Sequence, residues 1–305
     1  MVILGISIVF VIIIICLAYQ YKIKRRIKEV AIGCLTNANG GLMNVYIEGR
    51  GNKTLIFMSG GGTVSPLLDF KSLYSRVSNV YKIVVIEKFG YGFSDILDKS
   101  RDIDSILNDT RQVLKENQIL PPYTLCSHSM SGIEALYWKQ VFPEEIEAII
   151  GLDMATPKAY ENSKINQTFF KVLSYINKTG ISLFIPKKIM GDAVKYGDLT
   201  HEEKKLYKEI FGTRFMSKTM LNEISKIKLN AEKIVMDNNN QTPMLLFVSN
   251  GIGTGFKKDK WQKIQNDFCS QQRYSKLVYL SCPHYVHNYE YKMISTEIIK
   301  WLGLE

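Results

Sequence analysis

The sequence has little cysteine and histidine, and it lacks the spacings that build disulfide frameworks, metal sites or phosphate loops. Its 305 residues include 5 Cys and 4 His, with no C-x-x-C pair and no G-x-x-x-x-G-K-[ST] loop. An odd number of unpaired cysteines argues against a disulfide framework and favours a reducing compartment. There is also no internal repeat and no low-complexity tract. We therefore expect no metal ion and no nucleotide on a phosphate loop.

Positive charge is in excess, but no nucleic-acid motif accompanies it. The formal net charge is +10, and the basic residues are scattered among acidic ones except for the cluster KIKRRIK at residues 22–28. This pattern predicts no nucleic-acid partner. The hydrophobic fraction of 46% over this length is enough for one large globular domain.

The longest uncharged run lies at the N-terminus. Residues 1–21 are rich in Ile, Val and Leu and are long enough to span a bilayer as a helix. The basic cluster follows this run, whereas a cleaved signal peptide carries its charge before it, and the bulky Ile15 before Cys16 does not fit a lipoprotein signal. We expect a single-pass transmembrane anchor over residues 1–21, a basic juxtamembrane linker over 22–39 and, by the positive-inside rule, a cytoplasmic domain behind it.

Short apolar runs alternate with segments of helical periodicity through most of the chain. Runs at 42–49 and 53–60 are joined by GRGNK, a turn cluster that predicts a hairpin. Further buried strands are predicted at Tyr81–Glu87, Tyr123–Ser127, Glu147–Asp153, Pro243–Ser249 and Lys276–Ser281. Helical segments such as DIDSILNDTRQVLKEN separate them. This alternation predicts an α/β fold with a mainly parallel sheet.

The pattern changes between Met154 and Asn240, where no buried-strand run occurs. The segment is typical of several helices, one of which begins at Thr200 as N-cap with Glu203 as its capping-box partner. We expect an α/β core over residues 40–153 and 241–305, with a helical cap over residues 154–240 inserted into it.

The stretch LCSHSMSG at 125–132 lies on a predicted strand-to-helix turn, where a nucleophile elbow would present a side chain above the sheet. Such a turn needs small residues two positions before and after the nucleophile. Ser129 has Ser127 and Ser131 at these positions. Ser127, by contrast, has the bulky Leu125 two positions before it, and Ser131 has the bulky Ile133 two positions after it. Ser129 is therefore the candidate nucleophile. The alternative is a group of polar residues that cap a helix.

The glycine-rich stretch MSGGGT at 58–63 directly follows a predicted buried strand. Consecutive glycines allow backbone N–H groups to face a cavity, as an oxyanion hole requires. Gly61 and Met130 are the candidate donors. The alternative is an ordinary flexible loop.

Among the histidines, His284 best suits a general base. It lies in the predicted loop between the last strand and the last helix, from which a side chain can reach an elbow serine. His287, three residues later, is the alternative base. His128 is expected to point away from its neighbour Ser129, and His201 is expected to be solvated at the start of a cap helix.

Several motifs resemble, in order and spacing, those of the α/β-hydrolase superfamily, in its esterase and peptidase branch with an inserted cap. These motifs are YIEGRGNKTLIFMSGGG, VVIEKFGYGFSD, SHSMSG, AIIGLD and PHYVH. The resemblance implies an α/β-hydrolase fold. The chain departs from the usual pattern at Ser59, Glu87 and Pro283, and none of these changes removes a required catalytic group.

The resemblance leaves two candidates for the acid of the triad. Most relatives carry it shortly after the strand represented here by PMLLFVS, but the first carboxylate there is Asp259, which comes late. Some members place the acid after the preceding strand in a GLD context, which here offers Asp153. We favour Asp153 and keep Asp259 as the alternative.

Together these residues predict a serine hydrolase that cleaves a small or lipophilic ester or amide without a cofactor. Ser129 would attack, His284 would transfer the proton, Asp153 would orient His284, and the N–H groups of Gly61 and Met130 would bind the oxyanion. An apolar wall in the cap is predicted from Phe169, Phe170, Leu173, Tyr175 and Ile176.

Two other functions remain open. An aminopeptidase like proline iminopeptidase would need a cap carboxylate for the substrate amine, and Glu202, Glu203 or Glu223 could serve. A catalytically silent binding protein with this fold is the other, because both glycines of the usual elbow are serines here.

Overall fold

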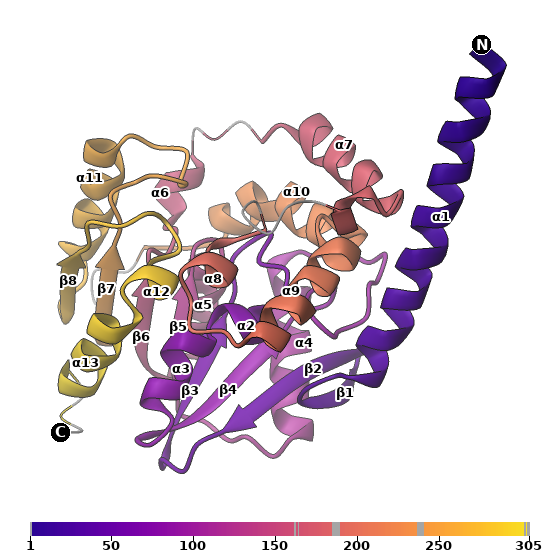
Figure 1. Cartoon of the computed structure of the whole chain (residues 1–305). Helices are drawn as coiled ribbons and strands as arrows, with labels where there is room; N and C mark the ends of the chain where they lie inside the picture. Colours follow the sequence, from indigo (N-terminus) through magenta and orange to yellow (C-terminus); the bar gives the residue numbers. More distant parts are fainter. Residues whose placement is uncertain are drawn as a thin grey trace.

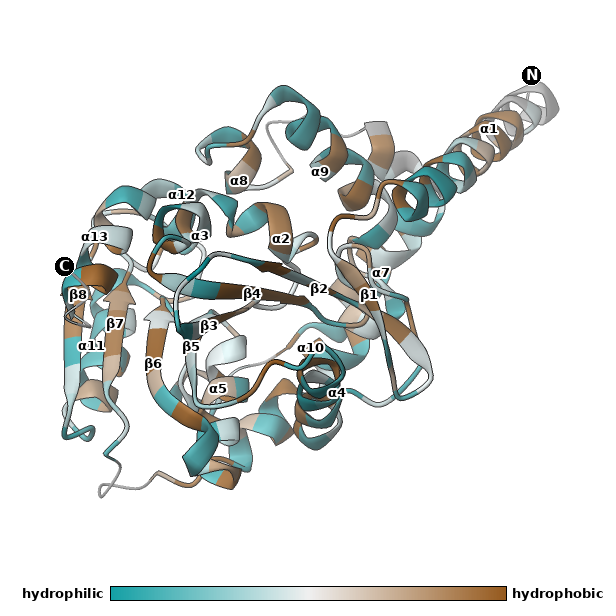
Figure 2. Cartoon of the chain, turned by 90° about the horizontal axis from the view of Figure 1, so that it is seen from below, coloured by the Kyte–Doolittle hydropathy of each residue, from teal (hydrophilic) through white to brown (hydrophobic). Residues whose placement is uncertain are grey.

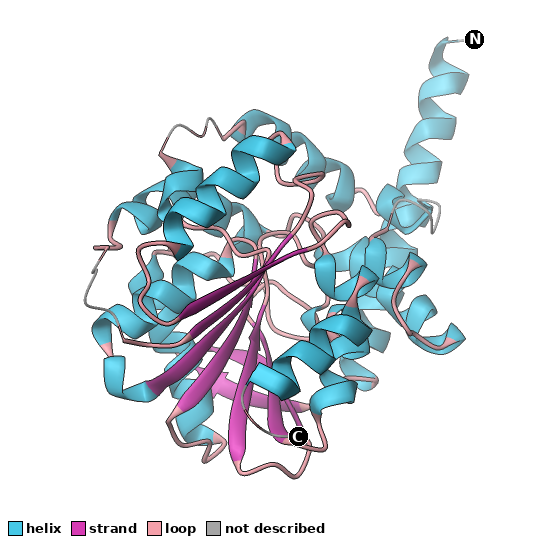
Figure 3. Ribbon diagram, turned by 90° about the vertical axis from the view of Figure 1, so that its left-hand side faces the viewer, coloured by secondary structure: helices cyan, strands magenta, loops and turns pink. Residues whose placement is uncertain are grey.

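The computed structural model describes residues 2–161, 163, 165–184, 190–236, 241–301 and 303. In that part of the chain, an eight-stranded sheet forms the centre and helices cover both of its faces (Figures 1 and 3). The strands are β1 Cys34–Ala38, β2 Gly41–Glu48, β3 Lys53–Met58, β4 Tyr81–Glu87, β5 Tyr123–His128, β6 Ile146–Leu152, β7 Met244–Val248 and β8 Ser275–Tyr279. Their spatial order is β1-β2-β4-β3-β5-β6-β7-β8.

The helices include long and short elements. The longer ones are α1 Val2–Glu29, α4 Ile103–Glu116, α5 Ser131–Val141, α7 Gln167–Lys178, α9 His201–Arg214, α10 Lys218–Glu232, α11 Lys258–Cys269 and α13 Tyr291–Trp301. The shorter ones are α2 Pro66–Asp69, α3 Lys71–Val77, α6 Pro157–Tyr160, α8 Asp192–Lys195, α12 Val286–Tyr289 and the 3-10 turns η1 Pro143–Glu145 and η2 Ile181–Phe184.

From β4 to β8 all neighbouring strands are parallel, whereas β1 and β2 join the sheet antiparallel. A parallel strand covered by helices on both faces must be apolar on both sides. Strand β7, with the sequence MLLFV, is buried at every position. The prediction of an α/β fold with a mainly parallel sheet is confirmed.

The predicted hairpin between residues 42–49 and 53–60 is wrong. Strand β4 lies between β2 and β3 and pairs with both of them. Because β4 is buried on both faces at the centre of the sheet, it needs hydrogen-bonding partners along both edges. The connection passes closely over the chain that precedes β4, and a Cβ atom at Gly51 would stand 2.0 Å from the Val80 carbonyl oxygen.

Helix α1 runs through the predicted anchor and continues into the predicted linker 22–39, the rest of which includes the edge strand β1. Its outer half projects from the molecule, while its second half packs on the body (Figure 1). Gln20 there is buried, and its Nε2 donates to the carbonyl oxygens of Asn177 at 2.8 Å and Gly212 at 3.0 Å.

Four of the α1 side chains whose burial the structure describes are buried, and they recur at helical spacing on one side: Cys16, Gln20, Ile23 and Ile27. Hydrophobic positions also remain on the exposed outer part (Figure 2). Among the residues that the structure describes, which leave out residue 1, we find no helix long and apolar enough to cross a bilayer. The predicted transmembrane anchor over residues 1–21 is therefore not supported.

Helices α6 to α10 lie in the chain between β6 and β7, in the segment predicted to be a cap. The predicted capping box of α9 is present, since Thr200 and Glu203 exchange side-chain hydrogen bonds with each other's backbone N–H. This segment contacts the loop after the carboxyl end of β4, where Arg214 Nε donates to the Gly92 carbonyl oxygen at 2.8 Å. The helical segment thus lies over the edge of the sheet at which α/β proteins bind ligands.

Candidate active site

Ser129 lies on the turn between β5 and α5, as the sequence predicts. Its φ of 54° is in the left-handed region, which is strained for a residue with a side chain and is typical of a nucleophile elbow. Gly60 packs directly against it, and a Cβ atom at Gly60 would lie 2.6 Å from Ser129 Cβ. The glycine-rich loop therefore approaches the serine as closely as the backbone allows.

Of the two serines that flank the turn, Ser131 holds it in place. Ser131 Oγ lies 2.7 Å from the Met58 carbonyl oxygen and accepts a 3.0 Å hydrogen bond from the backbone N–H of His128. Ser127 Oγ contacts Met154 Sδ at 3.6 Å. Both serines are fully buried, so neither presents a hydroxyl for reaction. Ser131 links the turn to the end of β3, a bond that a glycine at this position could not make.

In the usual elbow motif, G-x-S-x-G, the second glycine stands two positions after the nucleophile. Here close packing requires a glycine three positions after Ser129, at Gly132. A Cβ atom at Gly132 would lie 2.4 Å from the Ala155 carbonyl oxygen. The backbone N–H of Ala155 in turn donates to the Ser129 carbonyl oxygen at 2.7 Å. The segment after β6 is therefore fixed directly against the elbow.

Three side chains meet at this turn in a continuous series of hydrogen bonds. Ser129 Oγ lies 2.7 Å from His284 Nε2, and His284 Nδ1 lies 2.6 Å from Asp153 Oδ2. His284 comes from the loop between β8 and α12, and Asp153 directly follows β6. These are the distances expected for a serine, a base and a carboxylate that orients the base.

Asp153 is fully buried, and its carboxylate is fully engaged. Its Oδ1 accepts a 2.7 Å hydrogen bond from the Ser249 backbone N–H and another of 2.7 Å from Trp261 Nε1. Such donors stabilise a carboxylate in a buried position. The alternative acid, Asp259, lies exposed in the first turn of α11. The structure thus brings Asp153, and not Asp259, to His284.

Gly61 and Met130, the predicted oxyanion donors, lie side by side. A Cβ atom at Gly61 would stand 2.8 Å from Met130 Cε, and Met130 is the N-cap residue of α5. The start of a helix carries unpaired N–H groups and a partial positive charge. The loop and the helix terminus therefore meet beside Ser129, where an oxyanion hole would have to be.

Of the other three histidines, one is exposed and two are buried. His201 is exposed at the start of α9, as expected. His128, expected to point away from Ser129, packs on the ring of His284, with ring centroids 4.7 Å apart. His287, the alternative base, is buried in α12, and its Nε2 lies 3.0 Å from Asp69 Oδ2. The structure therefore leaves His284 as the histidine that contacts Ser129.

A buried cluster of charges lies beside the elbow and was not predicted from the sequence. Lys88 Nζ lies 2.5 Å from Glu134 Oε1 and 2.5 Å from Glu223 Oε1, and Tyr91 donates its hydroxyl to Glu223 Oε1 at 3.2 Å. Burial raises the pKa of Glu134 to about 7, and the neighbouring Glu223 adds to this effect. The cluster joins α5, the loop after β4 and the cap helix α10.

Among the described residues, the cap residues that the sequence singled out make no hydrogen bond to Ser129 or His284, although Glu223 belongs to the buried cluster beside the elbow. Glu202 is exposed, Glu203 pairs with Lys71, and Glu223 pairs with Lys88. Three side chains of the predicted apolar wall are exposed on α7: Phe169, Tyr175 and Ile176.

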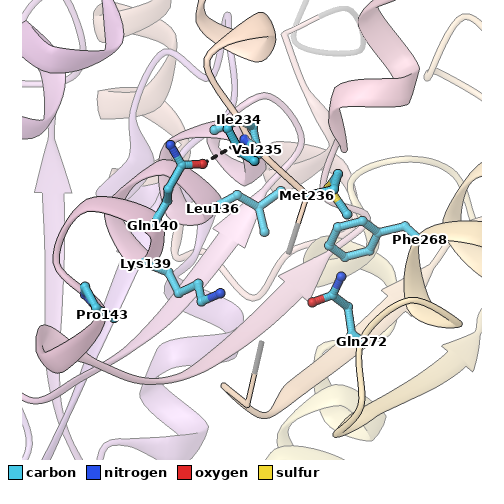
Figure 4. Close-up of a pocket in the computed structure, with 9 residues that line it drawn as sticks. All are labelled: Leu136, Lys139, Gln140, Pro143, Ile234, Val235, Met236, Phe268 and Gln272. Atoms are coloured by element: carbon cyan, nitrogen blue, oxygen red, sulfur yellow. Dashed lines mark hydrogen bonds between the residues drawn. The ribbon is translucent and has the colours of Figure 1, made fainter. Parts of the chain in front are cut away.

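A separate cavity of about 190 Å³, shown in Figure 4, has a lining that does not include Ser129, His284 or Asp153. It lies between α5, α11 and the chain that follows α10, and Gln140 Oε1 there accepts a 2.8 Å hydrogen bond from the Val235 backbone N–H. Its lining consists of Leu136, Lys139, Gln140, Pro143, Ile234, Val235, Met236, Phe268 and Gln272. Since Ser129, His284 and Asp153 do not line it, we do not assign it to the candidate site.

No model of a known protein family matches the chain. The uncharacterized protein YbdG of Bacillus subtilis (strain 168) is 38% identical over 228 residues, which cover 72% of this chain and 70% of YbdG.

Solved structures with a similar fold include three from different bacteria, and each match covers 88% of this chain. A haloalkane dehalogenase, DbeA of Bradyrhizobium elkani USDA94, is 15% identical, with a TM-score of 0.64 over 97% of that chain. A probable hydrolytic enzyme of Pseudomonas aeruginosa PAO1 is 12% identical, with a TM-score of 0.66 over 93%. A thermophilic esterase of Thermogutta terrifontis is 14% identical, with a TM-score of 0.63 over 96%. At these identities the likeness establishes a shared fold and does not identify the reaction.

Proposed function

The chain belongs to the same family as Bacillus subtilis YbdG and has the α/β-hydrolase fold. From the side chains that meet at the Ser129 turn, we propose that it is a serine hydrolase that cleaves a carboxylic ester or amide. The observation that carries the proposal is the series of hydrogen bonds from Ser129 through His284 to Asp153. A hydroxyl, an imidazole and a buried carboxylate in this order form the arrangement that activates a serine for acyl transfer.

The geometry supports a two-step reaction. Ser129 Oγ attacks the carbonyl carbon while His284 Nε2 takes its proton, and Asp153 stabilises the imidazolium that forms. The N–H groups of Gly61 and Met130 stabilise the negative carbonyl oxygen of the tetrahedral intermediate. His284 then gives the proton to the leaving alcohol or amine, and an ester to Ser129 remains. Water, deprotonated by His284, releases the acid and restores the serine.

Dehalogenation, the reaction named for one structural neighbour, does not suit this nucleophile. A serine oxygen that displaced halide from a saturated carbon would form an ether, which water does not readily cleave. The enzyme could then act only once. Attack on a carbonyl gives an ester instead, which the same histidine can hydrolyse.

An aminopeptidase is a weaker candidate. Binding a substrate ammonium group would need a free carboxylate near the serine, but Glu203 and Glu223 are engaged by Lys71 and Lys88, and Glu202 is exposed. Release of p-nitroaniline from proline p-nitroanilide at a rate above that of simple esters would favour the aminopeptidase instead.

For localisation, we propose that the outer part of α1 contacts a lipid surface, with the catalytic domain on the cytoplasmic side. Its exposed apolar side chains include Phe10, Val11, Ile12, Ile14, Ile15 and Leu17. The basic cluster at 22–28 follows them, and such a cluster favours anionic lipid headgroups. Sedimentation with anionic but not zwitterionic vesicles would support the lipid contact, and equal recovery in both supernatants would oppose it.

The hydrolase proposal is tested with p-nitrophenyl esters whose acyl chains run from acetyl to dodecanoyl. We expect turnover of at least one ester by the folded wild-type protein and its loss in Ser129→Ala. Ser127→Ala is the matched control, because it removes a neighbouring buried hydroxyl that does not contact His284. Failure of the folded wild type to hydrolyse any ester or amide would favour a silent binding protein.

A further inference from the structure

A second histidine–aspartate pair lies beneath the candidate triad. His287 Nε2 lies 3.0 Å from Asp69 Oδ2, and the side chains are 0% and 1% exposed. Asn288 Nδ2 also donates to Asp69, at its Oδ1, over 3.3 Å. Asp69 belongs to α2 and the other two residues to α12, so the pair fastens α2 to the segment that follows His284.

His128 connects this pair to the triad. Its ring centroid lies 4.6 Å from that of His287 and 4.7 Å from that of His284. Its Nε2 lies 3.2 Å from the backbone carbonyl oxygen of His284. Because His128 directly precedes Ser129, this contact joins the turn that carries the nucleophile to the loop that carries the base.

The protonation state of His128 follows from its surroundings. Burial lowers the pKa of His128 well below its usual range, and the nearby His287 and His284 add to this effect. The ring is therefore neutral and carries one N–H. A carbonyl oxygen accepts but cannot donate, so the contact with His284 requires the proton on Nε2.

We propose that His128, supported by the Asp69–His287 pair, is a positioning residue that holds His284 in register with Ser129. Its Nε2–H fixes the backbone carbonyl of His284 and thereby the distance between His284 Nε2 and Ser129 Oγ. The proposal rests on the proposed hydrolase function. Other hydrogen bonds secure the His284 loop from a different side: the His284 backbone N–H donates to the Ile252 carbonyl oxygen at 2.9 Å, in the loop after β7. His128 supplies a direct link to the elbow itself.

The test compares two replacements of His128. Glutamine places an amide N–H near the position of the imidazole Nε2, whereas leucine fills similar space without a donor. In His128→Leu we expect kcat to fall about 10-fold to 100-fold while KM changes less than about 3-fold, since a small misplacement of the base slows the chemistry more than binding. In His128→Gln we expect kcat within about 3-fold of the wild type. Thr124→Val, which alters a buried residue at the other end of β5, is the matched control.

A purely structural role predicts a different result. Leucine and glutamine would then lower the amount of folded protein without changing kcat per folded molecule, or they would lower kcat equally. Either outcome overturns the proposal. Should His128→Leu not fold, Asp69→Asn keeps the size of the supporting side chain, and we expect a fall in kcat of about 3-fold to 10-fold at unchanged KM. An unchanged kcat in Asp69→Asn would equally contradict the proposed support.

A spectroscopic measurement separates this proposal from the hydrolase proposal. The proton between His284 Nδ1 and Asp153 should give a low-field proton resonance in the wild-type protein, which Asp153→Asn removes. We expect the resonance to broaden or shift in His128→Leu and to persist in His128→Gln. An unchanged resonance in His128→Leu would refute positioning by His128, whether or not the protein hydrolyses esters. If the wild-type protein shows no turnover, the proposed hydrolase function is refuted. The resonance in His128→Leu would then still test whether His128 positions His284.

Discussion

The indole N–H of Trp261 donates a 2.7 Å hydrogen bond to Oδ1 of Asp153, the carboxylate whose other oxygen contacts His284. The backbone N–H of Ser249, at the end of β7, donates to the same Oδ1. The end of strand β7 thus supplies a donor to a carboxylate that follows the neighbouring strand β6. Two donors on Oδ1 hold this buried carboxylate while its Oδ2 contacts His284.

The acid can be identified by two matched substitutions. Asp153→Asn should lower kcat for ester hydrolysis about 10³-fold to 10⁴-fold, because the asparagine side chain no longer stabilises the imidazolium or fixes its tautomer. Asp259→Asn changes an exposed carboxylate and should leave kcat within about 2-fold. Steady-state kinetics of both variants decide the question. A large loss in Asp259→Asn with an active Asp153→Asn would reverse the assignment.

The serines that flank Ser129 should differ in their effect on stability. Ser131→Ala leaves the Met58 carbonyl oxygen and the His128 N–H without their buried partner, which should cost about 1 to 3 kcal/mol in the free energy of unfolding. Ser127→Ala removes a weak contact to sulfur and should cost less than about 1 kcal/mol. Urea titrations measure both values. A loss in Ser131→Ala as small as that in Ser127→Ala, below about 1 kcal/mol, would show that Ser131 does not hold the turn.

The buried charge cluster should make stability depend on pH. The folded-state pKa of Glu134, about 7, lies above its ordinary value of 4.5, so the contribution to stability present below pH 4.5 is lost as the pH rises through 7. Glu134→Gln cannot ionise and should match the wild type near pH 5. Near pH 8 it should be more stable than the wild type by up to about 3 kcal/mol.

Thermal unfolding of wild type and Glu134→Gln between pH 5 and pH 8 checks this expectation. Glu144→Gln, which alters an exposed carboxylate just after α5, serves as the control and should track the wild type throughout. A constant difference between Glu134→Gln and wild type over this range would mean that the Glu134 carboxyl titrates outside it.

The second half of α1 should contribute to the stability of the domain. Ile27 is 1% exposed, and Ile27→Ala should lower the free energy of unfolding by about 2 to 4 kcal/mol. Tyr21 on the same helix is 73% exposed, and Tyr21→Ala should change the free energy of unfolding by less than about 0.5 kcal/mol. Equal and small effects would indicate that α1 does not pack on the domain in solution.

The sequence predicted the strand–helix alternation and the residues of the turn at Ser129, because both depend on local pattern. Apolar runs mark buried strands, and the size of the neighbouring side chains singles out Ser129 among three serines. The choice between Asp153 and Asp259 depends on tertiary structure, because it requires knowing that β6 lies beside β7 and where α11 lies. The sequence favoured Asp153 through a resemblance, and the structure places it against His284.

Features that depend on contacts between distant residues were missed. The hairpin prediction failed because strand order in a sheet is set by tertiary packing, which places β4 between β2 and β3. The cluster of Lys88, Glu134 and Glu223 joins three elements that no local pattern connects. The sequence also did not indicate where the His128 ring lies, which at the end of β5 is against the loop of His284.

The central claim is that Ser129 is a nucleophile activated by His284. The most direct measurement is intact-protein mass spectrometry after reaction of the folded protein with a fluorophosphonate, followed by peptide mapping of the modified residue. We predict one adduct per chain on Ser129, its absence in Ser129→Ala and its retention in Ser127→Ala. No adduct on the folded wild-type protein, or an adduct on a residue other than Ser129, would contradict the account.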